Sequence, residues 1–158
     1  MALAPMSQPG PLLVPLDFSP TSEVVLEFAA DMAGRFDAEI VLLHVEAAAE
    51  TAPLDGDGLA RRERSRAALE RARSTLVERG LSVRTLLRPG DPAREVLRLA
   101  DVERPLAIVI GSHGHSRSTA PLLGSVSDRV VRYAGWPVLL VPHPSRRLTS
   151  TVTRSAAS

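Results

Sequence analysis

Five short apolar runs alternate along the chain with four stretches of helical periodicity, and this order constrains the fold more than any other feature. The runs expected as strands cover residues 12–16, 38–46, 81–90, 105–111 and 137–142. Strands that alternate with helices predict a parallel sheet with helices on both faces. Because the crossovers of such a sheet are right-handed, we expect a doubly wound, Rossmann-like α/β fold with strand order 3-2-1-4-5.

The first helix is expected directly after Ser19, which can cap it, with Pro20 in the first helical position. Apolar residues then recur at helical spacing, and we expect them to face the core: Val25, Phe28, Ala29 and Met32.

The later helices also begin and end at recognisable residues. An Arg- and Glu-rich helix is expected over 59–79, with Gly80 as its C-terminal cap. The apolar stripe of that helix comprises Ala68, Leu69, Ala72, Thr75 and Leu76. Asp91 is expected to cap the third helix, and the fourth helix should begin at Ser125 and stop at Gly135. Val126, Val130 and Ala134 should share one side of this fourth helix.

Composition limits the chemistry available to the chain. All 19 basic residues are Arg, and the sequence contains neither Lys nor Cys. These absences exclude a Walker-type phosphate-binding lysine, a Schiff-base mechanism, disulfides and thiolate metal sites. A bound nucleotide would therefore need other groups around its phosphates.

Length and patterning predict one domain between two short ends. The 158 residues and the 44% apolar content suit a single core. We expect a flexible leader over residues 1–10, the domain over 11–143, and a flexible basic tail over 144–158.

Charge and hydropathy favour neither a nucleic-acid nor a membrane partner. The net charge is +1, and acidic residues are interspersed among the Arg residues. The first ten residues lack a secretory pattern, and no apolar run approaches the roughly 20 residues of a membrane span. We therefore expect a cytoplasmic protein.

A glycine-rich segment follows the fourth predicted strand. Gly111, Gly114, Gly124 and Ser125 have the spacing G-x2-G-x9-G-S. Glycines let backbone amides approach a ligand closely, and the free N–H groups at the start of a helix attract anions. Ser125 and Ser127 would add hydroxyl donors there. The segment predicts a phosphate site, and the alternative is a strand-to-helix turn without a ligand.

The predicted strand order brings two distant segments together. Asp17 follows the first strand and Gly111 ends the fourth, and the chain reverses its winding between these two strands. Open parallel sheets bind ligands at such a switch point. Asp17 would there be a nucleoside ligand or, alternatively, only a residue of the helix entry in the sequence LDFSP.

The segment GSHGHSRSTAPLLGSVSDRVVRYAGWPVLLVP resembles the ATP-binding branch of the universal stress proteins, whose motif is G-x2-G-x9-G-[ST]. The segments LLVPLDFSPTSEVVLEFA, IVLLHV and GDPAREVLRLA are similar to the first strand and helix, the second strand, and the entry to the third helix of that family. The resemblance covers residues 12–142 and implies a fold of the adenine nucleotide alpha hydrolase type.

The resemblance also implies a site for ATP, with Mg²⁺ carried by the phosphates and no metal site built by the protein. The implied contact residues are Asp17, Val45, Gly111, Gly114, Gly124, Ser125, Val126 and Ser127. The Val45 backbone would read the adenine edge, Asp17 would lie beside the nucleoside, and the others would hold ribose and phosphates. Ser127 stands where many members have Thr, which keeps the hydroxyl.

The family commonly dimerises through its last strand, which corresponds here to Pro137 to Pro142. The resemblance therefore implies a homodimer, and an apolar edge strand is a suitable surface for pairing.

Several polar residues allow a stronger or a weaker interpretation. His113 and His115 would bind an anion or face solvent, and the alternative is a general base for ATP hydrolysis. Arg117 would face solvent or fold over a γ-phosphate, and His44 is expected as a satisfied histidine of the core or its rim. We identify no catalytic residue and no protein-built metal site.

The leading hypothesis is a regulatory ATP-binding dimer of the stress response. A slow ATPase or autophosphorylating enzyme is one alternative, with Ser125, Ser127 or His113 as participants. A nucleotide-free dimeric interaction module is another, and the intact glycine motif argues against it. The sequence lacks three features of enzymes that transfer phosphoryl groups quickly: a Lys, a D-F-G-like metal-binding triplet and a recognisable catalytic-base loop.

Overall fold

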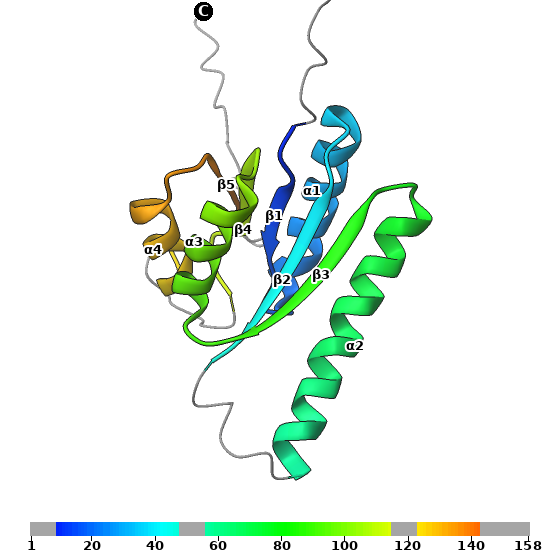
Figure 1. Cartoon of the computed structure of the whole chain (residues 1–158), viewed down its shortest axis with the longest axis vertical. Coiled ribbons are helices and arrows are strands. Elements are labelled where there is room, and N and C mark those ends of the chain that lie inside the picture. Colours follow the sequence, from blue (N-terminus) through cyan, green and yellow to red (C-terminus); the bar gives the residue numbers. More distant parts are fainter. Residues whose placement is uncertain (1–8, 48–55, 115–122, 143–158) are drawn as a thin grey trace, which may run out of the picture.

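The computed structural model describes residues 9–47, 56–114 and 123–142. The predicted tail, most of the predicted leader, His115 and Arg117 lie outside these residues. The described part contains one five-stranded parallel sheet with helices packed against it (Figure 1).

The strands are β1 (Leu12–Pro15), β2 (Ile40–Glu46), β3 (Val83–Pro89), β4 (Ala107–Gly111) and β5 (Val138–Val141). They lie in the order β3-β2-β1-β4-β5, and every pairing is parallel. The predicted topology is therefore confirmed. Because β1 is central and β4 lies beside it, the winding reverses between these two strands.

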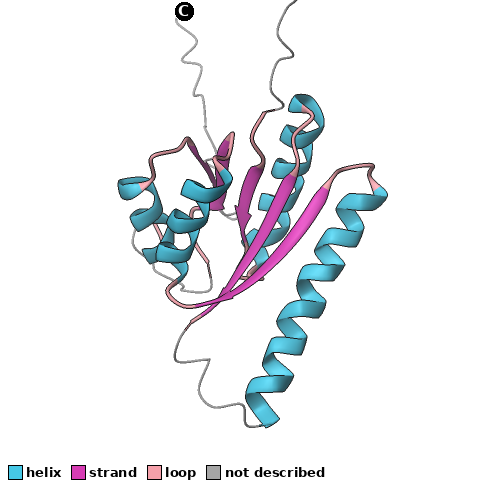
Figure 2. Cartoon of the chain, in the orientation of Figure 1, coloured by secondary structure: helices cyan, strands magenta, loops and turns pink. Residues whose placement is uncertain are grey.

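The helices are α1 (Pro20–Phe36), α2 (Gly56–Glu78), α3 (Pro92–Glu103) and α4 (Ser125–Tyr133). Helices α1 and α2 cover one face of the sheet, and α3 and α4 cover the other (Figure 2). The central strands are buried on both faces, as their uninterrupted apolar sequences predict.

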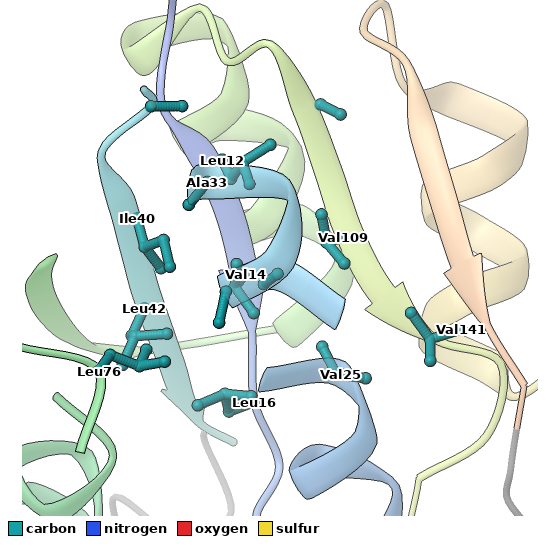
Figure 3. Close-up of a cluster of buried hydrophobic side chains, with 14 of the residues drawn as sticks. Leu12, Val14, Leu16, Val25, Ala33, Ile40, Leu42, Leu76, Val109 and Val141 are labelled. Atoms are coloured by element: carbon teal, nitrogen blue, oxygen red, sulfur yellow. The ribbon is translucent and has the colours of Figure 1, made fainter. Parts of the chain in front are cut away.

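Side chains of β1 alternate between the two faces. Leu12 and Val14 pack with Val25 and Ala33 of α1 on one face (Figure 3). Leu13, between them in sequence, packs on the opposite face, in the cluster formed with α3 and α4. This period of two is the geometry of an extended strand, and it gives the domain two apolar layers.

The helix boundaries predicted at Asp91, Gly80 and Ser125 are confirmed. The Asp91 side chain caps α3 by accepting from Arg94 N–H at 2.8 Å. Gly80 has a φ of 82° after α2, a conformation that glycine adopts without a Cβ clash. The expected stop at Gly135 is wrong, because α4 already ends at Tyr133 and Ala134 is extended.

Other boundaries and core assignments also differ from the sequence prediction. Helix α2 begins at Gly56, three residues before the predicted start at 59, and β1 ends before Leu16. Phe28 is 40% exposed, because α1 buries the row that contains Val25 and Ala29. Thr75 is also exposed, and its hydroxyl donates to the Arg71 carbonyl within α2.

Candidate functional site

A cavity of about 240 Å³ opens where the carboxyl ends of β1, β2 and β4 meet the first turns of α1, α3 and α4. This position is the switch point of the sheet. The eight residues predicted from the sequence all line it: Asp17, Val45, Gly111, Gly114, Gly124, Ser125, Val126 and Ser127. The fold thus brings segments from three loops to one place.

Asp17 joins the end of β1 to the start of α1. Its Oδ1 accepts a hydrogen bond from Ser19 N–H at 2.9 Å and another from Ser22 Oγ at 3.1 Å. Asp17 therefore serves the helix entry, which was one of its two predicted roles. Ser19 was expected to cap α1, but its side chain makes no capping bond, and Ser22 N–H donates instead to the Ser19 backbone carbonyl at 2.9 Å.

The three motif glycines are explained by close approach of the backbone and not by unusual backbone angles. Among the described glycines, those with positive φ are Gly80 and Gly90. A Cβ on Gly114 would overlap Oδ2 of Asp17, so the glycine loop lies directly against that carboxylate. A Cβ on Gly124 would lie 3.4 Å from both His113 Cα and Ser112 O.

The structure gives a reason for glycine at position 111 that the sequence did not predict. A Cβ there would lie 2.8 Å from Cγ2 of Thr21 and 3.5 Å from Cγ2 of Val25, both in α1. Packing is thus one reason for glycine at this position, and the expected ligand contact of Gly111 stays a prediction. Gly111 lets the end of β4 pass close beneath the first turns of α1.

The two serines of α4 occupy different environments. Ser125 is exposed at the first position of the helix. Ser127 is 4% exposed, and its Oγ donates to the Gly111 carbonyl at 2.8 Å and lies 3.2 Å from the Ser112 carbonyl. In this structure the Ser127 hydroxyl bonds the loop, and its donation to a phosphate stays a prediction.

The backbone supplies partial positive charge to the cavity, and the Asp17 carboxylate adds a negative group to its wall. The N-terminal ends of α1, α3 and α4 all line it, and each helix start carries partial positive charge and unbonded N–H groups. None of the described residues that line the cavity is an Arg. An anion in this cavity would therefore be held by peptide groups, with hydroxyls as further polar partners.

An exposed ion pair links two of these helix starts. Arg129 Nη1 of α4 lies 2.9 Å from Asp91 Oδ2 at the cap of α3. The hydrogen bond from Arg129, and then the bond from Arg94 N–H, lower the pKa of Asp91. Asp91 thus both caps α3 and holds α4 beside it.

The described histidines near the cavity are already engaged. His44 has its Nδ1 2.7 Å from the Leu16 carbonyl, as expected for a satisfied histidine at the core rim. His113 has its Nδ1 3.1 Å from Ser112 Oγ. No cluster of three metal-ligating side chains occurs in the described ranges.

Sequence reasoning missed several residues of the cavity wall. Ser19 and Thr21 line it, and their buried hydroxyls have no hydrogen-bond partner among the described residues. Pro92 and Val96 of α3 line it from the other face. Pro92 could have been found, because the first turn of a helix that follows a strand lies at the same edge as the carboxyl ends.

The model of the universal stress protein family matches residues 10–142. The chain belongs to this family. Universal stress protein MJ0531 of Methanocaldococcus jannaschii is 29% identical over 141 residues, which are 85% of this chain and 83% of the relative. Universal stress protein YxiE of Bacillus subtilis is 33% identical over 143 residues, which cover 82% of this chain and 97% of the relative.

Solved universal stress protein structures share the fold. The structure of MJ0577 has a TM-score of 0.77 at 28% identity, and the match covers 86% of this chain and 97% of that one. A universal stress protein from Archaeoglobus fulgidus, solved in complex with dAMP, has a TM-score of 0.63 at 26% identity and covers 84% of this chain and 98% of its own. A nucleotide is thus bound by a structural relative within this family.

Proposed function

We propose that this universal stress protein binds an adenine nucleotide, ATP in particular, in the switch-point cavity. The observation that carries the proposal is the convergence of three helix N-termini on one cavity with no Arg among its described lining residues. Peptide N–H groups at helix starts are suited to a phosphate chain and need no cationic side chain. The nucleotide of the Archaeoglobus fulgidus relative supports the same assignment.

The proposed orientation follows the two ends of the cavity. The phosphates lie at Gly114, Gly124 and Ser125, where the glycine loop meets the start of α4. The base lies at the β2 side, where the Val45 backbone reads the adenine edge, and Asp17 lies beside the nucleoside. Mg²⁺ arrives with the nucleotide and is held mainly by phosphate oxygens.

A regulatory role is proposed in preference to catalysis. Binding of a nucleotide to helix starts from three segments would couple their relative positions to ligand occupancy. We further propose a homodimer through β5, which lies at one edge of the sheet and exposes 38% of Leu140. No helix in the described ranges has the length and apolar content of a membrane span, and a cytoplasmic location stays a prediction.

The binding test compares Gly124→Val with a matched control. Gly124→Val places a branched side chain where the loop meets α4, and we expect calorimetric titration to show at least a tenfold loss of ATP affinity. Gly34→Val is the control, because a Cβ at Gly34 meets nothing within 4 Å in α1. Equal ATP affinity in both folded variants would refute the phosphate assignment.

An enzymatic alternative is tested separately with the same preparations. Phosphate release is followed over many turnovers at saturating ATP. Regulatory binding predicts a rate equal to that of buffer while ATP remains bound, and turnover that depends on the protein would instead favour the ATPase.

A further inference from the structure

The end of β5 lies beside the glycine motif. Val141 pairs with Gly111 across β5 and β4 (Figure 3). The Val141 carbonyl accepts from Ser112 N–H at 2.8 Å, and the Ser112 carbonyl accepts from Gly124 N–H at 2.7 Å. Pro142, the next residue of the chain, is exposed. The chain therefore leaves the sheet two hydrogen bonds away from the start of α4, where the phosphates are proposed to lie.

The segment that follows, residues 143–158, carries charge of one sign. It contains Arg146, Arg147 and Arg154 and no acidic residue, and it lies outside the described residues. Arg146 and Arg147 follow Pro142 by four and five residues. An extended chain spans roughly 3.3–3.6 Å per residue, so the Cα atoms of these two residues cannot be more than about 18 Å from that of Pro142. Their long side chains can thus reach the start of α4.

The charges around the cavity leave a place for a cation. Its described lining includes the Asp17 carboxylate and no Arg. Arg129, in the second turn of α4, is already paired with Asp91 at 2.9 Å. The peptide N–H groups of a helix start offer only partial positive charge, whereas a triphosphate brings several full negative charges. A basic segment that begins at this edge of the sheet is therefore complementary in charge to a bound nucleotide.

We propose that Arg146 and Arg147 of the segment 143–158 bind the phosphates of a nucleotide held in the switch-point cavity. This inference rests on the proposed function, since it requires phosphates at the start of α4. A guanidinium group suits this contact, because its planar donors can bind two phosphate oxygens at once. The peptide groups of the cavity remain the first contact, and the two Arg residues add to it. Their contribution should increase with the number of phosphates and vanish for a nucleoside.

The experiment measures nucleotide affinity by calorimetric titration of the full chain. The test variant is Arg146→Gln/Arg147→Gln, which removes two charges and keeps side chains that can form hydrogen bonds. We expect its ATP affinity to fall at least about fivefold, its AMP affinity to fall less, and its adenosine affinity to stay within about twofold. The control is Arg64→Gln/Arg71→Gln, because these exposed residues of α2 carry the same charge and do not line the cavity. The control should keep its ATP affinity within about twofold.

Three results would overturn the inference while leaving nucleotide binding intact. One is unchanged ATP affinity in the test variant, another is an equal loss for adenosine, and the third is an equal loss in the control, which would show a general effect of net charge. Absence of ATP binding to the natural protein would refute the proposed function and the inference together. Mn²⁺-ATP gives a test without substitution, because its paramagnetism should broaden the NMR signals of residues 145–148 more than those of 155–158. Broadening that is equal or absent in both groups would also overturn it.

Discussion

Replacing Ser127 with Ala tests whether this hydroxyl holds the glycine loop or binds phosphate. The Ser127 Oγ is buried and donates to the Gly111 carbonyl at 2.8 Å. Removing a hydrogen bond of this kind costs about 0.5–1.5 kcal/mol of unfolding free energy, and a carbonyl left desolvated adds to the loss. We therefore expect Ser127→Ala to be destabilised by about 1–2 kcal/mol without any nucleotide, which is a fall of about 2–8 °C in Tm for a domain of this size.

The assay combines urea unfolding of the ligand-free protein with titration by ATP and by adenosine. If the hydroxyl holds the loop, the free energy of unfolding falls in the absence of ligand. Any loss of nucleotide affinity then comes from the altered loop and not from a missing hydroxyl–phosphate bond. Ser127→Thr keeps the hydroxyl and should retain most of the ligand-free stability. Unchanged ligand-free stability in Ser127→Ala, together with at least a tenfold loss of ATP but not adenosine affinity, would refute the structural reasoning and restore the phosphate-donor role.

Three further predictions concern α3, the contact between β4 and α1, and the sheet edge. Asp91→Ala should cost about 1–2 kcal/mol at neutral pH and Asp91→Asn under about 1, measured by urea unfolding, because Asn keeps the cap and loses the exposed ion pair. Since folding lowers the pKa of Asp91, its carboxylate stabilises the fold above the unfolded pKa, and this stabilisation disappears as pH falls through the folded pKa. The free energies of unfolding of the natural protein and of Asp91→Asn should therefore converge in strong acid. Gly111→Ala should cost about 1–3 kcal/mol, because its Cβ would meet Thr21 Cγ2, and adding Thr21→Ser should restore part of that loss; an additive loss would exclude this contact. Leu140→Asp should shift sedimentation from dimer to monomer, whereas Leu59→Asp, on α2, should not.

The strand order and the place of the cavity could be predicted because they depend on coarse patterns. Apolar runs such as that of β2 identify buried strands, and the alternation with helices fixes the parallel arrangement. The loops after β1 and β4 then meet at one edge, which brings Asp17 and Gly114 together. These inferences need only residue classes and the handedness of crossovers.

Details of side-chain partners could not be predicted, because they depend on distances between segments remote in sequence. A buried Ser at the third position of α4 can donate to a phosphate or to a carbonyl, and the sequence does not show that the Gly111 carbonyl lies within reach of Ser127. The exposure of Phe28 has a similar origin. Phe28 and Ala29 lie about 100° apart around α1, and the helix buries Ala29 and leaves Phe28 40% exposed.

Main-chain donors give the cavity an unusual response to mutation. A peptide N–H is present at every residue except proline, so most single substitutions around the start of α4 leave the donor set unchanged. A site made of Arg or Lys side chains could lose its charge in one step. Here, anion binding is lost through added volume at a glycine or through proline at a donor position, and descendants that no longer bind nucleotide should carry one of those two changes.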